Sequence, residues 1–428
     1  GSRAVSSHTG ALAGSDAAVD ALFRKAGIVR CSSREEMVNV ANVFLHKELK
    51  GDRIAVITHA GGPGVLLTDA LAKNNMKVPH ISGAKADELL SKLFHGSSVA
   101  NPIDFLATGT AEQLGTILDY VDNEFEDIDA AAVIFGTSGL FDIKDVYAVL
   151  NEKMKTSRKP IYPILPSLVQ AADAIEMFKA FGRGFFPEEV AFGNALAKLY
   201  HTPRPAVAGS EIQADTKLIR SVVESSPNGY LAHEQVGQLL DAIGIPRAKE
   251  GTASSKAEAV SLANEIGFPV VMKVVGPVHK SDVGGVCLGI KSDAEAEAAF
   301  ERMMTIDGAT GVLVQRMASG MEFFAGATRE DKFGHLVLCG LGGIFIEVLK
   351  DTAAALVPIS KETAHSMIQS LRSYPLFKGV RGKDPIDEAL FAEIIMRLSA
   401  LLEAAPEIAE LDLNPLLCAG KSIIAVDA

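Results

Sequence analysis

Short apolar segments alternate with helical patterns between residues 52 and 200, and this alternation constrains the fold more than any other feature of the chain. The segments RIAVITHA, AAAVIFGTS and KPIYPIL each have the length and apolar character of a strand, and a helical pattern follows each of them. Strands that alternate with helices form a parallel sheet with helices on both faces. We therefore expect a doubly wound α/β domain, whose first helix spans residues 65–73 after a glycine-rich turn at Gly61 to Gly64.

The first 50 residues contain a smaller strand and helix pattern. The small-residue loop SSHTGALAGSD precedes a helix over residues 16–26, and Gly27 is placed to end that helix. The segment IVRC, residues 28–31, is expected to form a short strand, and a second helix is expected over residues 33–49. Such a fragment is too small to stand alone, so we expect it to be part of a larger domain.

Residues 213–428 follow a different pattern after HTPRPAVAGS, a stretch that has the composition of a linker. The helical segment LAHEQVGQLLDAIGIP leads into a strand PVVMKVV, a returning strand CLGIK and a helix over residues 294–304. The segments GVLVQRM, MEFFAGATRE and GHLVLCGLGG have the character of antiparallel strands. Mixed sheets with helices indicate an α+β region, which is long enough for two lobes.

Length and composition exclude some classes of protein. A chain of 428 residues is too long for one core, so two to four domains are expected. No apolar run is long enough to cross a bilayer. The 53 acidic and 41 basic residues give a net charge of -12 with no basic cluster, which disfavours nucleic acid as a partner. The separated cysteines, Cys31, Cys287, Cys339 and Cys418, are expected to be reduced core thiols of a cytoplasmic protein.

Two segments place a histidine among small residues. In SSHTG the small neighbours leave His8 accessible, as a covalent phosphoryl carrier requires, although the segment taken alone favours a loop histidine bonded to its own backbone. In VHKSDVGG the histidine is His279, and Lys273 on the preceding strand can pair with nucleotide phosphates. Gly284 and Gly285 let backbone N–H groups approach an anion. A polar surface turn is the alternative for this second segment.

Oxygen ligands gather near the C-terminus of the sequence. Alternation along one strand puts Asp412 and Asn414 on the same face, and Asp427 comes from the next strand. A carboxylate and an amide carbonyl on adjacent strands suit Mg²⁺, which keeps several waters for substrate phosphates. A polar strand end is the alternative.

Two glycine-rich turns complete the candidate segments. Gly61-Gly62-Pro63-Gly64 follows a strand and opens a helix, which points N–H groups at an anion. Gly340-Leu341-Gly342-Gly343 permits close backbone packing, and the following Glu347 and Asp351 either face a nucleotide or are solvated.

These segments gain specificity from their order. The series SSHTGALAGSD, ITHAGGPGV, NPID, FPVVMKVVGPVHKSDVGGV, GLGGIFIEVLKD and ELDLNPLL resembles the ADP-forming (NDP-forming) acyl-CoA synthetase family, which is related to succinyl-CoA synthetase. The resemblance covers essentially the whole chain. It implies the C-terminal part of a phosphohistidine domain at residues 1–50, a flavodoxin-like domain at 51–205 and a two-lobed ATP-grasp domain at 206–428.

The resemblance also implies a reaction. Acyl-CoA, ADP and phosphate are interconverted with a carboxylic acid, CoA and ATP in the presence of Mg²⁺, through acyl-phosphate and phosphohistidine intermediates. By motif, His8 matches the histidine that is phosphorylated near the acyl and CoA site, and Asp412 matches the acid that orients it. His279 matches a second histidine that relays the phosphoryl group to ADP.

The remaining matches concern ligands. Lys273 would bind nucleotide phosphates, and Gln315 and Met317 would form the hinge between the lobes at adenine. Asn414 and Asp427 would hold Mg²⁺. The turn residues Gly61, Gly62 and Gly64 would face the phosphate on His8, and Arg381 in GVRGKDP would contact phosphate.

The resemblance also implies an N-terminal CoA-binding domain and the first half of the phosphohistidine domain, which we expect either in a longer polypeptide of which this sequence is a part or in another chain. The alternative function is a non-catalytic ligand-sensing module of a protein acetyltransferase, which the presence of both histidines disfavours. The family implies a homodimer, and the acid and the choice of ADP or GDP stay open. Asn101 to Asp104 either contribute to acyl specificity or cap a helix.

Overall fold

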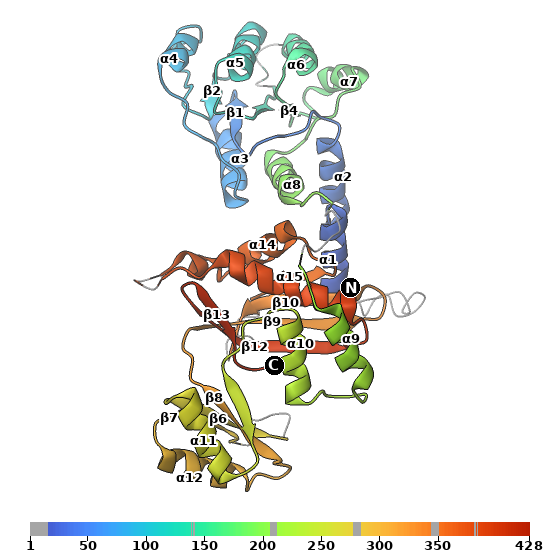
Figure 1. The fold of residues 1–428 in the computed structure, drawn as a ribbon. Helices are drawn as coiled ribbons and strands as arrows, with labels where there is room; N and C mark the ends of the chain where they lie inside the picture. The colour runs from blue at the N-terminus through green and yellow to red at the C-terminus, as the bar shows by residue number, and fades with distance from the viewer. Residues whose placement is uncertain are drawn as a thin grey trace. The chain divides into compact units, whose positions relative to one another are not determined.

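The computed structural model describes residues 16–137, 139, 142–205, 212–276, 284–343, 351–380, 382 and 384–428. The chain forms two compact units (Figure 1). The parallel-sheet unit comprises residues 27–204, and the C-terminal unit comprises residues 205–428 together with the helix α1 (Asp16–Ala26). Each unit is described by itself.

The parallel-sheet unit is built on four strands in the order β2-β1-β3-β4. All three pairings between these strands are parallel. The strands are β1 (Ile54–Thr58), β2 (Ile103–Asp104), β3 (Ala130–Ile134) and β4 (Ile161–Ile164). Every residue of β1, β3 and β4 is buried, as expected for strands covered on both faces. The expected doubly wound sheet is confirmed.

Helices cover both faces of this sheet (Figure 1). One apolar core contains side chains of α4, α5, α6 and α7, and the other contains side chains of α2, α3 and α8. The helices are α2 (Arg34–Val43), α3 (Gly61–Lys73), α4 (Ala84–Leu90), α5 (Ala111–Asn123), α6 (Lys144–Thr156), α7 (Ala172–Ala180) and α8 (Glu189–His201).

Three expected boundaries in this unit are wrong. The segment 28–31 is not a strand, since it pairs with no strand among the residues that the structure describes. The helix α2 ends at Val43, and no described element continues to residue 49. The helix α3 begins at Gly61 instead of residue 65, so the glycine-rich turn is the first turn of the helix itself.

The C-terminal unit contains a large antiparallel sheet in the order β11-β10-β9-β12-β13. Its strands are β9 (Met321–Glu330), β10 (Gly334–Leu341), β11 (Thr352–Leu356), β12 (Glu410–Ala419) and β13 (Ser422–Ala425). A large apolar core joins this sheet to α9 (Thr216–Ser225), α10 (His233–Ala242), α14 (Lys361–Ser370), the 3-10 helix η2 (Tyr374–Lys378) and α15 (Glu388–Ala404). The helix α1 packs on β11 through Ala21.

A second sheet in the same unit forms what we call the small lobe. Its strands, in the order β5-β8-β6-β7, are antiparallel. They are β5 (Glu250–Ala253), β6 (Val270–Val275), β7 (Val286–Ile290) and β8 (Gly311–Arg316). The helices α11 (Lys256–Ile266) and α12 (Asp293–Met303) cover one face of the sheet with apolar side chains. The expectation of two lobes is confirmed.

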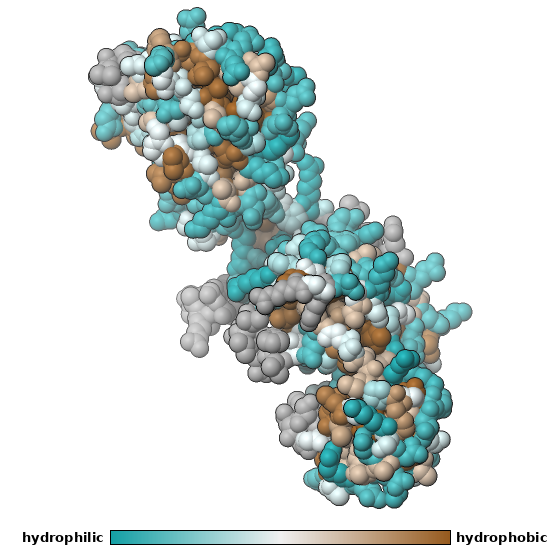
Figure 2. Space-filling view, turned by 90° about the vertical axis from the view of Figure 1, so that its left-hand side faces the viewer, coloured by the Kyte–Doolittle hydropathy of each residue, from teal (hydrophilic) through white to brown (hydrophobic). Residues whose placement is uncertain are grey.

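All four cysteines are free thiols, but only two of them lie fully in the core. Cys339 and Cys418 are buried, and burial raises the pKa of each thiol to about 12, whereas Cys31 and Cys287 are partly exposed. Apolar areas reach the surface (Figure 2), and exposed apolar side chains include Phe44 and Leu45 just after α2. Within the described ranges, no helix is long and apolar enough to cross a membrane.

Candidate functional site

Lys273 is a buried lysine on the face of the small-lobe sheet that α11 and α12 do not cover. On β6 the neighbouring side chains of Met272 and Val274 belong to the core beneath α11 and α12, so alternation directs Lys273 to the opposite face. The residue is 6% exposed. Its Nζ donates a hydrogen bond to the carbonyl oxygen of Val426 and lies 3.8 Å from Oδ2 of Asp427. A lysine buried to this degree requires such partners, because an unpaired buried charge is costly.

Gln315 lies on the same face, on the neighbouring strand β8. The antiparallel register pairs Val271 of β6 with Gln315. The amide nitrogen Nε2 of Gln315 donates hydrogen bonds to Oε2 of Glu250 at 2.6 Å and to the carbonyl oxygen of Val426 at 3.1 Å. Lys273 and Gln315 therefore share one acceptor in the C-terminal segment. Met317, just beyond β8, is exposed and its N–H donates to the carbonyl oxygen of Pro269 at 3.3 Å.

Asn414 and Asp427 come from opposite sides of the last hairpin. Leu416 pairs with Ala425, and the N–H of Val426 donates to the carbonyl oxygen of Pro415 at 3.3 Å. Continuing this antiparallel register places Asn414 opposite Asp427. The expectation that Asp427 belongs to a strand is wrong, because β13 ends at Ala425.

Negative charge is concentrated around Asp412 on the same strand. Burial of the carboxyl by surrounding protein raises the pKa of Asp412; a hydrogen bond with Asn414 opposes this rise, and the charges of Glu410 and Asp427 add to it. A cation would relieve this repulsion. The described residues contain no group of three His, Cys, Asp or Glu side chains that could enclose a metal ion. One carboxylate and one amide carbonyl nevertheless fit Mg²⁺, which usually takes few protein ligands and completes its shell with water and phosphate.

The glycines at the start of α3 lie in the parallel-sheet unit. The N-cap residue Ala60 provides no side-chain hydrogen bond, so the first N–H groups of the helix receive no N-cap side chain within the described part of the chain. A Cβ atom on Gly64 would meet Cγ2 of Thr58 at 2.9 Å, so packing requires that glycine. A Cβ on Gly62 would meet no described atom within 4 Å. Packing therefore gives no reason for Gly62, and open space adjoins the helix end.

Two further side chains lie near this helix end, namely Asp104, which belongs to the candidate segment 101–104, and His59, which was not predicted from the sequence. A Cβ on Gly61 would lie 3.7 Å from Oδ2 of Asp104, which closes β2. His59 follows β1, its ring contacts Phe135 with centroids 4.5 Å apart, and burial lowers its pKa. Both lie at the carboxyl ends of parallel strands, where ligands bind in open α/β sheets, so their position was a usable signal.

Asn101 has a structural role in the same region. Its side-chain oxygen accepts from the N–H of Val56 at 2.9 Å, and its amide nitrogen donates to the carbonyl oxygens of Ile54 at 3.0 Å and Pro79 at 2.9 Å. These three bonds occupy the side chain with backbone of its own unit. His8, His279 and Arg381, which the sequence singled out, lie outside the described residues, as does Glu347.

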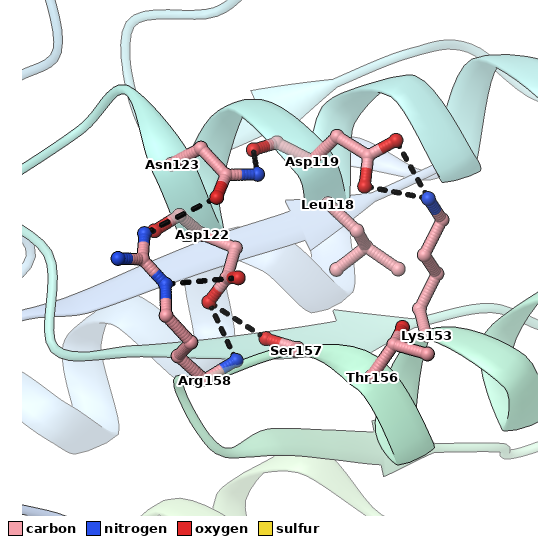
Figure 3. A pocket seen from close by; sticks show the side chains of 8 residues that line it. All are labelled: Leu118, Asp119, Asp122, Asn123, Lys153, Thr156, Ser157 and Arg158. Carbon is pink, nitrogen blue, oxygen red and sulfur yellow. Dashed lines mark hydrogen bonds and ion pairs between the residues drawn. The ribbon is translucent and has the colours of Figure 1, made fainter.

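A separate surface hollow lies between the C-terminal ends of α5 and α6 (Figure 3). Its charged side chains pair with each other, Lys153 with Asp119 at 2.5 Å and Arg158 with Asp122 at 3.5 Å. Both helices lead into the amino ends of strands, which is the edge opposite to that where open α/β sheets bind ligands. These ion pairs connect α5 with the C-terminal end of α6, and nothing described in the hollow indicates a ligand.

Comparison with known proteins gives two family matches. A model described as an ATP-grasp domain matches residues 222–428. A model described as a succinyl-CoA ligase like flavodoxin domain matches residues 1–44. The two-lobed C-terminal unit agrees with the first of these, and the fold class expected from the sequence is confirmed.

Curated relatives extend the similarity along the chain. Acetate--CoA ligase [ADP-forming] I of Archaeoglobus fulgidus is 32% identical over 97% of this chain and 62% of its own length. The 4-hydroxybutyrate--CoA ligase [ADP-forming] of Nitrosopumilus maritimus has the same identity and the same coverage of both chains. This chain therefore spans about three fifths of the length of these two relatives.

A third relative is matched over nearly its whole length. The beta subunit of acetate--CoA ligase [ADP-forming] I of Pyrococcus furiosus is 40% identical over 49% of this chain and 95% of its own. Together with the two-lobed fold, this match identifies the chain as a member of the ADP-forming acyl-CoA ligase family.

Proposed function

We propose that the chain transfers a phosphoryl group between ATP and histidine side chains as part of an ADP-forming acyl-CoA ligase. The observation that carries the proposal is the convergence of Lys273, Gln315 and Asp427 at one face of the small lobe. In this proposal the Lys273 ammonium leaves Asp427 when nucleotide binds and pairs with a phosphate. Gln315 and Met317 then lie beside the adenine base of the nucleotide.

The metal site in the proposal consists of Asn414 and Asp427. Mg²⁺ held there would neutralise charge on the phosphates during transfer. The chain's own contribution is to orient these two oxygens, which the hairpin register supports. Gly343 supports the position of Asn414, because its N–H donates to Oδ1 of Asn414 at 3.3 Å.

The two histidines carry the phosphoryl group in the proposal. His279 accepts it from ATP, and His8 exchanges it with the acyl-phosphate site. Asp412 orients phosphorylated His8, and a raised pKa does not prevent this, because the cationic imidazole ring and Mg²⁺ both favour its charged form. The helix end at Gly61 and Gly62 would face the phosphate, and Arg381 would contact it.

The complete reaction belongs to the whole enzyme. We propose that it interconverts acyl-CoA, ADP and phosphate with a carboxylic acid, CoA and ATP. Residues 1–50, 51–205 and 206–428 would supply part of the phosphohistidine domain, a flavodoxin-like domain and the ATP-grasp domain. A homodimer is the proposed assembly, by resemblance to the family alone.

The test is incubation of the purified chain with γ-labelled ATP and Mg²⁺, followed by measurement of acid-labile, alkali-stable label on the protein. We expect wild type to be labelled, His8→Ala to keep label on His279 and His279→Ala to lose it all. His80→Ala is the matched control, since His80 is exposed on a loop and has no proposed role. ATP binding by wild type without any label would contradict the catalytic proposal and favour a ligand-sensing module.

A further inference from the structure

Glu250 forms the centre of a half-buried polar cluster behind Gln315. Its Oε1 lies 3.1 Å from Nε2 of His233 and accepts a hydrogen bond from the Arg247 guanidinium at 2.6 Å. Its Oε2 accepts the 2.6 Å bond from Nε2 of Gln315. Both carboxylate oxygens are therefore engaged, one by a histidine and an arginine and the other by the candidate base-binding glutamine. The strands bring this about, because Glu250 of β5 pairs directly with Gln315 of β8.

The cluster keeps Glu250 ionised. Burial alone would raise the pKa of this carboxyl, but hydrogen bonds from His233 and Gln315 and the neighbouring Arg247 charge outweigh burial and lower the pKa overall. An ionised carboxylate only accepts hydrogen bonds. The carbonyl oxygen of Val426, the second partner of Gln315, also only accepts.

These two acceptors determine which end of the Gln315 amide points toward them. Only the NH₂ group can donate to both, so the chemistry of the two acceptors fixes the orientation of the amide. The opposite orientation would set Oε1 against two acceptors. Oε1 of Gln315 has no hydrogen-bond partner among the described residues, and it is the atom left for a ligand.

We propose that Glu250 is a positioning residue that sets the nucleotide base preference by fixing the Gln315 amide with its oxygen toward the ligand. The inference rests on the proposed function, in which a nucleotide binds at Lys273 and Gln315. An acceptor oxygen matches a purine with an amino donor at position 6, as in adenine. A purine with a carbonyl at position 6, as in hypoxanthine or guanine, places a second acceptor against it.

The discrimination follows from an unpaired polar group. A site built to bond a donor rejects an analogue that lacks it, because the partner is left unpaired or repelled. We expect the Kd of inosine diphosphate to exceed that of ADP by about 10-fold or more in wild type. Inosine diphosphate carries a carbonyl oxygen at the position of the ADP 6-amino group and a proton on N1, so the comparison changes only the hydrogen-bonding edge of the base.

The experiment measures the Kd of ADP and of inosine diphosphate for the full chain with Mg²⁺ by isothermal titration calorimetry. In Glu250→Gln one of the two acceptors becomes a neutral amide that both donates and accepts, so Gln315 is held less firmly and the ratio of the two Kd values should fall toward one. Gln315→Leu should also bring the ratio near one, with both nucleotides bound more weakly.

The matched control is Glu388→Gln in the C-terminal unit. Glu388 is a similar carboxylate, bonded by His365 at 3.0 Å and by Nε2 of Gln369 at 2.9 Å, but its cluster does not include Gln315. Its replacement should leave the ratio at the wild-type value. If Glu250 had only a structural role, Glu250→Gln would weaken the binding of both nucleotides equally and leave the ratio of their Kd values unchanged.

The outcomes separate this inference from the proposed function. Binding of neither nucleotide by folded wild type would defeat the proposed function. Equal binding of both by wild type, or an unchanged ratio in Glu250→Gln, would overturn the positioning role while leaving the nucleotide site in place. If Glu250→Gln does not fold, the wild-type and Gln315→Leu ratios decide, since a wild-type preference that survives in Gln315→Leu also overturns it.

Discussion

Replacement of Lys273 by methionine tests the nucleotide site most directly. Methionine keeps much of the apolar stem of the side chain and removes the ammonium. In the free protein this ammonium donates to Val426 and lies 3.8 Å from Asp427, whose side chain is 33% exposed. The ion pair is long and its carboxylate is partly solvated, although Lys273 itself is buried, so exchanging Asp427 for a phosphate gives up only part of the ammonium's interaction.

The expected loss can be worked from these contacts. A hydrogen bond to a charged group contributes about 1.5–3 kcal/mol, and part of that is offset because the free protein gives up its own contacts. We expect a loss of about 2 kcal/mol, which is roughly a 30-fold increase in the Kd of Mg²⁺–ADP. Adenosine, which has no phosphates, should bind wild type and Lys273→Met with similar Kd values.

The assay is isothermal titration calorimetry with a control variant in the same lobe. Lys249→Met is suitable, because Lys249 is exposed and pairs with Glu265 at the surface at 3.0 Å. It should bind Mg²⁺–ADP as wild type does. A Kd for Lys273→Met within about 3-fold of wild type, in a variant with an unchanged melting temperature, would refute the assignment of Lys273 to the phosphates.

Three further predictions concern other parts of the chain. Asp427→Asn should raise the Mg²⁺ concentration that supports ADP binding by about 10-fold, measured by Mg²⁺ titration, since a charged oxygen ligand is lost; an unchanged midpoint would remove it from the metal site. Gly62→Asp should keep or slightly raise the melting temperature, because an acid suits a helix N-terminus, yet reduce phosphoryl label on His8, and full labelling would contradict the anion role. Asp122→Ala should lower the free energy of unfolding, measured in urea, by about 2–4 kcal/mol. The control Asp119→Ala, which removes only a surface ion pair, should lower it by less than about 1 kcal/mol. Although burial opposes the charge of Asp122, bonds from the Lys159 and Arg158 N–H groups and the Ser157 hydroxyl lower its pKa overall, so its contribution is complete above the unfolded pKa of about 4. The difference between Asp122→Ala and wild type should shrink as pH falls below that value, and a constant difference would refute the linkage.

Strong local patterns predicted much of the fold. The alternation in MEFFAGATRE gave the bounds of β9, and Gly27 correctly marked the end of α1, where its φ is 69°. The apolar character of IVRC did not make a strand, because strand formation requires a pairing partner that local sequence does not reveal. The start of α3 was missed because glycine has a low helix propensity, which packing and the helix end overrode.

In the candidate site, local sequence likewise predicted some side-chain positions, whereas others depend on strand pairing. Alternation along β6 was enough to put Lys273 on the face away from the core. Glu250 carried no local signal, because its importance depends on the pairing of β5 with β8, strands that are about 60 residues apart in the chain. The side chains of His59 and Asp104 likewise gain their place from the order of strands in the parallel sheet.

The path of the last residues has a practical consequence for anyone handling this protein. Ala425 exchanges backbone hydrogen bonds with the segment that leads into β5, at 2.9 Å with Pro246 and 3.2 Å with Ala248. The carbonyl oxygen of Val426 then accepts hydrogen bonds from Lys273 and Gln315. An affinity tag fused after Ala428 would begin two residues after Asp427. Such a fusion would crowd the nucleotide face, and a purification handle at the other end of the chain avoids this interference.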